Sequence, residues 1–387
     1  MPTTTLDPVS DVLGSAERLL ARRTGAPVTL ADPEDLGGSG RSVVLRVRVD
    51  ENPFQLPRTL VVKQVRGERG TPRRDGAGGA SPSGEEQREA FLREVVSYQF
   101  ATALHADHRP GASLVGYDVD AQLLVLADLG SAPTMAEVVA TQDGSALHHA
   151  LMAWAQALGR LHAATAGREQ DFAALLRRTD DTAWVDPLDA PARAALHELP
   201  GLVQTHLGVT APEAVLARAA RCERLLGGGM RAFSPSDLCP GNALVTADGV
   251  KFLDFEGGGF RDVVLDAAYM LVPFPDCWCT CTLSEAQARD VVQAWRSEVV
   301  GVWPQLADDQ ALATRLLDAQ LLWVVASTHW FLPAAPARRG PSSTHTLARP
   351  RTEALVTRWT RLGQAAETAG DHALAGYAAA VSAALAA

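Results

Sequence analysis

The sequence predicts an α+β protein with two lobes, a small lobe built on an antiparallel β-sheet and a larger lobe that is mainly helical. Strand and helix patterns alternate in the first part of the chain, whereas helical patterns dominate the later part. A chain of 387 residues is also long enough to bury two substantial cores. We therefore expect an N-terminal lobe over residues 1–127 and a helical C-terminal lobe over residues 128–387.

Short apolar runs predict the strands of the first lobe. Residues 28–30 lead into a turn and then into residues 43–49, which alternate as a strand with one solvated face does. Residues 59–65 are rich in β-branched side chains, which favour strands. Residues 114–118 and 123–127 predict two more strands. The order of these runs predicts a hairpin followed by a third strand and then by two further strands.

Gly38, Ser39 and Gly40 lie in the turn of the predicted hairpin. Glycine lets the backbone approach a ligand closely, so this turn is a candidate phosphate clamp. Taken alone the signal is weak, because most such runs are simple turns. Residues 66–84 contain almost no side chain suited to burial, and we expect a mobile loop there.

Apolar residues at helical spacing predict the helices. They recur along residues 9–23, 85–104 and 148–165, and alanine-rich helical patterns fill residues 283–387. His162 lies in the third of these helices and could be taken for a base, but we expect it to support the core. The helices that follow the predicted sheet therefore make up most of the C-terminal lobe.

The chain has two lysines, Lys63 and Lys251, among its 35 basic residues. Lysine is a compact point charge that can approach a single phosphate oxygen, which the planar arginine fork does less easily. Lys63 lies in the predicted strand over residues 59–65, and we expect it to contact the phosphates of a nucleotide. Glu94 borders the apolar face of the following helix and could hold the lysine ammonium, with Glu89 as the competing candidate.

Residues 234–256 carry the most specific pattern in the chain. Asp237 precedes Asn242, and a turn and an apolar strand then lead to Asp254. A catalytic carboxylate followed by a metal-binding amide and a metal-binding carboxylate is typical of kinase-type phosphotransferases. We expect Asp237 to act as the catalytic base, and Asn242 and Asp254 to hold Mg²⁺. The structural alternative is that Asp237 and Asn242 only shape a turn.

With these motifs the chain resembles the aminoglycoside phosphotransferase and choline kinase-like family of small-molecule kinases, which have a protein-kinase-like fold. The similarity extends over roughly residues 30–275. The matching segments are Leu60-Val61-Val62-Lys63, Val125-Leu126-Ala127-Asp128-Leu129-Gly130, Ala157-Leu158-Gly159-Arg160-Leu161-His162, Asp237-Leu238-Cys239-Pro240-Gly241-Asn242, Leu253-Asp254-Phe255-Glu256 and Leu265-Asp266-Ala267-Ala268-Tyr269.

The resemblance implies ATP or GTP and Mg²⁺ as cofactors. It implies that the backbone of Leu126, Asp128 and Leu129 forms the hinge that binds the base of the nucleotide. It also implies that Glu94 is the partner of the phosphate-binding lysine. Asp266 matches an aspartate that supports the catalytic loop in related kinases.

The chain departs from the family pattern at two places. Residues 235–237 are Pro-Ser-Asp, where the family usually has His-Gly-Asp. The hinge has Ala127 before Asp128, where the family commonly has glutamate. Neither change removes a phosphate or metal ligand, so we expect an active enzyme.

Composition restricts the partners. A net charge of −10 argues against a broad nucleic-acid-binding surface, and no apolar run approaches the roughly 20 residues needed to cross a bilayer. No secretory signal pattern opens the chain, so we expect a cytoplasmic protein, either a monomer or a homodimer. The cysteines at positions 277, 279 and 281 alternate along an extended segment, and we expect pocket lining or burial there more than a metal site.

The leading hypothesis is an ATP- and Mg²⁺-dependent phosphotransferase. It would move the γ-phosphate to a hydroxyl of a small molecule, either an antibiotic such as an aminoglycoside or nucleoside antibiotic, or a metabolite. Residues 283–387 are the expected acceptor-binding helices, although their nine acidic residues and nine arginines do not favour a polycation. Antibiotic resistance is a role suggested by the resemblance alone.

Three alternatives remain open at this point. The first is a nucleotide-binding module without turnover, suggested by the missing histidine. The second is a kinase of a sugar or amino alcohol. The third is a protein kinase, which is disfavoured because the sequence shows no recognisable activation segment ending in Ala-Pro-Glu.

Overall fold

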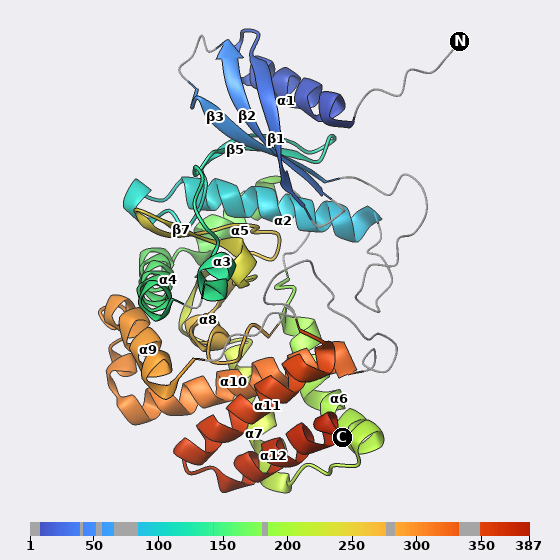
Figure 1. Ribbon diagram of the computed structural model, residues 1–387, viewed down its shortest axis with the longest axis vertical. Helices are drawn as coiled ribbons and strands as arrows, with labels where there is room; N and C mark the ends of the chain where they lie inside the picture. The colour runs from blue at the N-terminus through green and yellow to red at the C-terminus, as the bar shows by residue number, and fades with distance from the viewer. Residues whose placement is uncertain are drawn as a thin grey trace.

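The computed structural model describes residues 8–38, 42–51, 56–65, 84–141, 143–179, 185–275, 283–332 and 349–387. Ser39, Gly40, almost all of the expected loop over residues 66–84 and the three clustered cysteines lie outside these residues. The described chain forms the predicted α+β architecture (Figure 1). A β-sheet with its flanking helices lies at the top of the view, and a larger body of helices lies below it.

Five antiparallel strands form the sheet. Their bounds are β1 Thr29–Gly37, β2 Ser42–Glu51, β3 Thr59–Val65, β4 Leu114–Asp118 and β5 Leu123–Ala127, and their order is β1-β2-β3-β5-β4. The predicted hairpin is β1 and β2, and the strands predicted over residues 43–49, 59–65, 114–118 and 123–127 are all present. The edges of the sheet are therefore β1 and β4, and β3 lies at its centre.

The two faces of the sheet have different partners. Helix α1, Pro8–Thr24, covers the outer face, where its apolar side packs on Leu45, Val47, Leu60 and Val62. Helix α2, Gly84–Thr102, runs below the opposite face (Figure 1). Side chains alternate along a strand, so the residues between the α1-facing ones in β2 and β3 point toward α2 and the helical body. Lys63 is one of these residues.

Most remaining helices form the lower body of the molecule (Figure 1). Its helices are α3 Met135–Ala140, α4 Gly144–Thr165, α5 Glu169–Thr179, α6 Asp189–Leu207, α7 Glu213–Cys222, α8 Val263–Tyr269, α9 Glu285–Val299, α10 Asp309–Phe331, α11 Arg351–Thr368 and α12 His372–Ala386. Short 3₁₀ helices cover Ala106–His108, Glu223–Leu225, Pro240–Asn242 and Pro304–Ala307. A large apolar cluster runs through this body and continues to the inner face of the sheet, and a smaller one lies around Phe100, Phe172 and Phe233.

Two small hairpin-like strand pairs position the segment over residues 234–256. Strand β6, Arg231–Ser234, pairs with β9, Gly259–Asp262, and strand β7, Ala243–Thr246, pairs with β8, Gly249–Phe252. Gly249, the first residue of β8 after the turn, has φ of 106°, a conformation that glycine adopts without strain. The β6–β9 pair therefore holds the two ends of the segment together, and the β7–β8 pair folds its middle into a hairpin.

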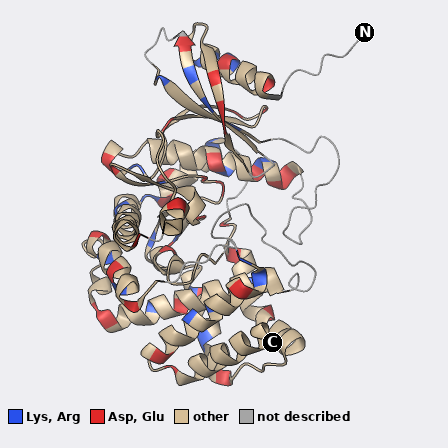
Figure 2. Ribbon diagram, in the orientation of Figure 1, with Lys and Arg blue, Asp and Glu red and all other residues tan. Residues whose placement is uncertain are grey.

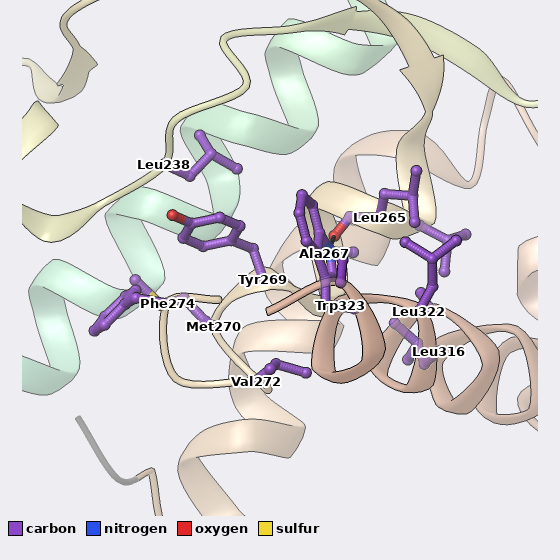
Figure 3. Packing of buried hydrophobic residues seen from close by; sticks show 14 of the residues in the cluster. Leu238, Leu265, Ala267, Tyr269, Met270, Val272, Phe274, Leu316, Leu322 and Trp323 are labelled. Carbon is purple, nitrogen blue, oxygen red and sulfur yellow. Dashed lines mark hydrogen bonds between the residues drawn. The ribbon is translucent and has the colours of Figure 1, made fainter. Parts of the chain in front are cut away.

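The floor beneath this segment is an aromatic part of the core (Figure 3). Leu238, the residue after Asp237, is fully buried and lies over the ring of Tyr269. Tyr269 packs edge-to-face on Trp323, whose indole nitrogen donates a hydrogen bond of 2.8 Å to the Leu265 carbonyl. Asp237 is thus anchored to the buried core through its neighbour Leu238.

Acidic and basic residues are mixed over both parts of the molecule, without a continuous basic stripe along the drawn helices (Figure 2). Among the helices in the described ranges, none combines the length and the apolar character that a membrane span requires.

Candidate active site

Lys63 joins three elements of the fold. Its ammonium Nζ lies 2.7 Å from Glu94 Oε1 on α2 and 2.6 Å from Asp254 Oδ1 after β8. Glu94 is only 1% exposed, Lys63 is 13% exposed, and Asp254 is 37% exposed. The lysine expected from the sequence is therefore brought together with the carboxylate expected as its partner. It is also brought together with a carboxylate expected as a metal ligand.

The competing candidate for the lysine's partner lies elsewhere. Glu89 accepts a hydrogen bond of 2.8 Å from Arg93 one helical turn further along α2. The two residues form an (i, i+4) pair, which is a common arrangement on helix surfaces. Of the two glutamates weighed from the sequence, the structure brings Glu94 to Lys63.

Burial and charge act together on this pair. Burial disfavours the charged ammonium, but the Glu94 and Asp254 carboxylates outweigh that effect and raise the pKa of Lys63 above its ordinary value. Burial raises the pKa of Glu94, and the Lys63 ammonium opposes that rise. The lysine is therefore held as a cation that can meet phosphate oxygens.

Direct packing holds α2 against the loop that carries Asp254. The rings of Tyr98 and Phe255 stack with their centroids 4.6 Å apart. Gly258 approaches α2 so closely that a Cβ at this position would lie 2.5 Å from Ser97 Oγ. These contacts explain why Glu94 and Asp254, which are far apart in the sequence, meet at the same lysine.

Asp237 and Asn242 form the second half of the site. The Asn242 side-chain nitrogen donates a hydrogen bond of 2.7 Å to Asp237 Oδ2, and the Cys239 amide donates one of 2.9 Å to Oδ1. The pattern expected from the sequence thus folds into one compact turn. These two donors fix the orientation of the Asp237 carboxylate, and a carboxylate has about four acceptor positions in all.

Asn242 directly precedes β7, and Asp254 lies two residues after β8. The β7–β8 hairpin therefore brings the two residues together at its open end. Its register pairs Ala243 with Phe252, and the Leu253 amide donates a hydrogen bond of 2.8 Å to the Asn242 carbonyl. Asp254 follows directly with φ of 59°, a left-handed conformation that is uncommon for residues other than glycine. The hairpin therefore positions Asp254 through backbone pairing and a sharp change of chain direction.

The donor atoms of Asn242 and Asp254 fit a magnesium ion. Mg²⁺ prefers oxygen ligands and usually takes only one or two carboxylates, with water and substrate phosphates completing its octahedron. An amide oxygen and a single carboxylate match that demand. Within the described ranges, no group of three or more His, Cys, Asp or Glu side chains is arranged as a metal site. The two residues could hold Mg²⁺ together with a nucleotide.

A chain of buried polar side chains supports the segment that carries Asp237. Asp266 on α8 accepts a hydrogen bond of 2.9 Å from Ser234 Oγ and one of 3.1 Å from His162 Nε2. The Trp295 indole donates to His162 Nδ1 at 3.0 Å, so this imidazole carries its proton on Nε2. The Ser236 amide in turn donates to Ser234 Oγ at 3.0 Å. His162 therefore belongs to the core support, as we expected from the sequence.

Two residues in this support were not identified from the sequence. Ser236 adopts φ of 76°, and its hydroxyl accepts a hydrogen bond of 2.8 Å from Arg261. Arg261 is almost fully buried and also bonds Asp186 at 3.0 Å and the Gly257 carbonyl at 3.1 Å. Nothing local in the sequence signals Arg261, because it lies in β9, 25 residues after Ser236. The loop without the family histidine is thus held by Ser234 and Arg261.

The expected nucleotide-binding residues lie along the sheet and its exit. Leu126 is buried at the end of β5, and Asp128 and Leu129 follow it where the chain leaves the sheet for the helices. The Asp128 side chain accepts a hydrogen bond of 3.0 Å from Arg46. Gly38 follows β1, and a Cβ there would lie 2.3 Å from the Ser42 carbonyl oxygen, so the turn requires glycine.

No protein-family model and no curated protein sequence matches the chain. Several solved structures are similar to it over most of their length. A choline/ethanolamine kinase family protein from Mesorhizobium loti has 16% identity and a TM-score of 0.43, with 91% of this chain and 92% of that chain covered. A choline kinase from Cryptosporidium parvum has 11% identity and a TM-score of 0.49, with 95% and 97% covered.

An aminoglycoside phosphotransferase in a ternary complex with streptomycin and ATP has 13% identity and a TM-score of 0.47, with 94% and 97% covered. At such identities and TM-scores, the assignment of chemistry rests on the geometry of the site itself. Choline kinases and aminoglycoside phosphotransferases, whose motifs the sequence resembles, are thus among the solved structures that are similar to this chain.

Proposed function

We propose that the protein is an ATP- and Mg²⁺-dependent phosphotransferase that phosphorylates a hydroxyl group of a small molecule. The observation that carries this proposal is the contact of the Lys63 ammonium with Glu94 at 2.7 Å and with Asp254 at 2.6 Å. A cation at this place, beside a carboxylate suited to a metal, can bind the charged part of a nucleoside triphosphate.

The reaction requires alignment more than covalent help from the protein. The acceptor oxygen forms a bond to the γ-phosphorus while the bond to the β–γ bridging oxygen breaks, and ADP leaves. Asp237 accepts the proton of the attacking hydroxyl. Lys63 would hold the α/β-phosphates. Asn242 and Asp254 would hold Mg²⁺, and a bound Mg²⁺ would supply positive charge that stabilises the phosphate oxygens.

The orientation of Asp237 favours catalysis over simple nucleotide binding. A pure binding module has no need for a carboxylate fixed by the Asn242 amide and the Cys239 backbone. The polar support through Ser234 and Arg261 replaces the absent histidine and argues in the same direction. We therefore rank turnover above the alternative of a nucleotide-binding module.

The acceptor is a hydroxylated small molecule, and residues 283–387 are the proposed acceptor-binding helices. Aminoglycosides, nucleoside antibiotics, sugars and amino alcohols form the set to be tested. A role in antibiotic resistance follows only if an antibiotic from this set is phosphorylated. We place the reaction in the cytoplasm, where ATP is available.

The test is Mg²⁺-dependent release of ADP from ATP across that set of acceptors, with Asp237→Asn as the matched variant. One acceptor class should stimulate release, and the variant should lose about 10²–10⁴-fold in turnover because its general base is gone. Nucleotide affinity should stay unchanged in the variant. Stimulated release that survives intact in Asp237→Asn would contradict the role of this residue. Failure of the unaltered chain to bind MgATP would contradict the proposed function.

A further inference from the structure

Arg46 of β2 connects the hairpin to the segment that leaves the sheet after β5. Its Nε donates to Asp128 Oδ2 at 3.0 Å, its Nη1 to Glu34 Oε2 at 2.9 Å and its Nη2 to the Gly130 carbonyl at 3.1 Å. The Arg46 side chain is 19% exposed and that of Asp128 only 7%. All three guanidinium nitrogens are therefore used in one bridge between β1, β2 and the proposed hinge.

The sheet register places this bridge relative to the phosphate-binding lysine. Arg46 pairs with Val61, and Val61 pairs with Leu126, so these three residues form one row across three strands. Lys63 lies in the next row on the same face, two residues further along β3. Two residues along a strand span about 7 Å. The row of Arg46 therefore lies about 7 Å from the row of Lys63, a distance shorter than a bound nucleotide.

The row of Arg46 is displaced from Lys63 toward the proposed hinge, which is the direction of the base end of the nucleotide. Val61 and Leu126 face the helical body between the lysine and the start of the hinge, where the base of a nucleotide held by Lys63 would lie. Arg46 is the β2 residue of the same row. Its guanidinium then reaches the hinge itself, through the side chain of Asp128 and the backbone of Gly130.

The hinge end of the bridge is preorganised. Asp128 Oδ1 accepts a hydrogen bond of 3.0 Å from the Gly130 amide, and Gly130 has φ of 80°. Asp128 therefore holds its own turn with one oxygen and Arg46 with the other. Its contribution to a nucleotide would come through its backbone and through the position it gives Arg46.

Arg48 offers an internal comparison. It lies two residues along the same strand and the same face, and it also forms two ion pairs, with Asp32 at 2.7 Å and Asp50 at 2.6 Å. Both partners belong to β1 and β2, and Arg48 is 46% exposed. Arg48 thus binds within the hairpin, whereas Arg46 ties the hairpin to the hinge.

We propose that Arg46 is a positioning residue that fixes the β1–β2 hairpin over the base end of the nucleotide site by bridging to Asp128 and Gly130. This inference rests on the proposed function. Fixing the hairpin before the nucleotide arrives reduces the ordering that binding must bring about, and preorganisation of this kind increases affinity. The effect should therefore fall on nucleotide affinity more than on the chemical step.

The test compares Arg46→Met with Arg48→Met by calorimetric titration with MgATP and by ADP-release kinetics. Arg46→Met should raise the dissociation constant about tenfold, and Arg48→Met should change it less than about twofold. The KM for ATP should follow, while kcat at saturating ATP falls less than the affinity does. Arg46→Lys should recover part of the affinity, because an ammonium can pair with Asp128 but cannot form all three bonds.

Equal affinities in Arg46→Met and Arg48→Met would overturn the inference, and so would a loss confined to kcat. If Arg46→Met does not fold, Asp128→Asn answers the same question, because it removes the charge that holds Arg46 and keeps the shape of the hinge. Unchanged affinity in a folded Asp128→Asn variant would overturn the inference. Absence of MgATP binding by the unaltered chain would instead remove the proposed function on which the inference rests.

Discussion

The proposed nucleotide side of the site and the proposed catalytic loop hold their charged groups in different ways. Lys63 meets Glu94 and Asp254, which lie 31 and 191 residues away along the chain. Asp237 meets Asn242 five residues away and the Cys239 amide two residues away. The first region therefore depends on the assembly of distant elements, whereas the second is largely a local turn resting on a rigid floor.

This difference has energetic consequences. A buried ion pair contributes little net stability, yet removal of one partner is costly because the other charge stays buried without compensation. A local turn made of side-chain and backbone hydrogen bonds costs less to disturb. Changes on the nucleotide side should therefore affect folding and cofactor binding together. Changes in the loop should lower catalysis while leaving folding and cofactor binding largely unchanged.

The largest expected effect concerns the two carboxylates that share Lys63. Asp254→Asn removes the single carboxylate proposed for the metal and should raise the Mg²⁺ concentration for half-maximal turnover by more than about 100-fold, since even outer-shell changes cost 10–100-fold. Glu94→Gln removes the other carboxylate partner of the lysine and leaves the metal ligands intact. Turnover as a function of Mg²⁺ concentration measures both variants. Equal shifts in the two would contradict a metal-binding role for Asp254.

The next effect is on stability. Lys63→Met leaves Glu94 buried without its nearby cation and should lower the free energy of unfolding by about 3 kcal/mol. Lys251→Met, at the other lysine of the chain, removes a half-buried ammonium whose hydrogen bond goes to the Arg109 carbonyl, and it should cost less. Urea unfolding of both variants measures the difference. A smaller loss in Lys63→Met than in Lys251→Met would show that the pair is not the stabilising link we describe.

The same variant has a characteristic pH dependence. Burial raises the pKa of Glu94 above its unfolded value, and loss of the Lys63 cation should raise it further. The native state then binds a proton that the unfolded state releases, so the stability from protonated Glu94 is present below the unfolded pKa and is lost as pH rises through the native pKa. Lys63→Met should therefore lose more stability between about pH 5 and about pH 8 than the unaltered protein.

The smallest expected effect lies in the loop support. Ser234→Ala removes a hydroxyl bonded to buried Asp266 and should cost about 1–3 kcal/mol in stability. Because this hydroxyl also holds the Ser236 amide, turnover should fall about tenfold while nucleotide affinity is kept. Ser327→Ala removes another fully buried serine, which accepts a hydrogen bond of 2.7 Å from Arg358 and lies outside the loop support. This variant should cost stability without that loss of turnover. Equal turnover in the two variants would contradict a positioning role for Ser234.

Much of the fold could be predicted because the patterns are regular. The alternation over β2, the β-branched run of β3 and the stripe on α2 each lie within one element, so the sequence shows which face is buried. Arg46 lies in the same alternation, but its partner Asp128 is 82 residues away. No periodicity indicates that pairing, which depends on the order of strands in the sheet.

The candidate site likewise contains residues that a local sequence pattern identified and residues that only tertiary contacts revealed. The spacing of Asp237 and Asn242 was sufficient to single out both residues, and the segment that joins them is short enough to form a local turn. The missing histidine gave no indication of what supports the loop instead. Ser234 and Arg261 take that place only because β6 and β9 pair and because α8 presents Asp266 beneath them.

The sequence alone determined the two-lobed α+β architecture, the lysine in its strand and the local turn from Asp237 to Asn242. The tertiary structure decided that Lys63 contacts Asp254 directly, that Arg46 bridges to the hinge and that Arg261 supports Ser236. Local contacts follow from a few backbone dihedrals and the residue types in one turn. Contacts between distant residues exist only once the packed core has fixed the elements relative to one another, and no single segment of the sequence specifies that arrangement.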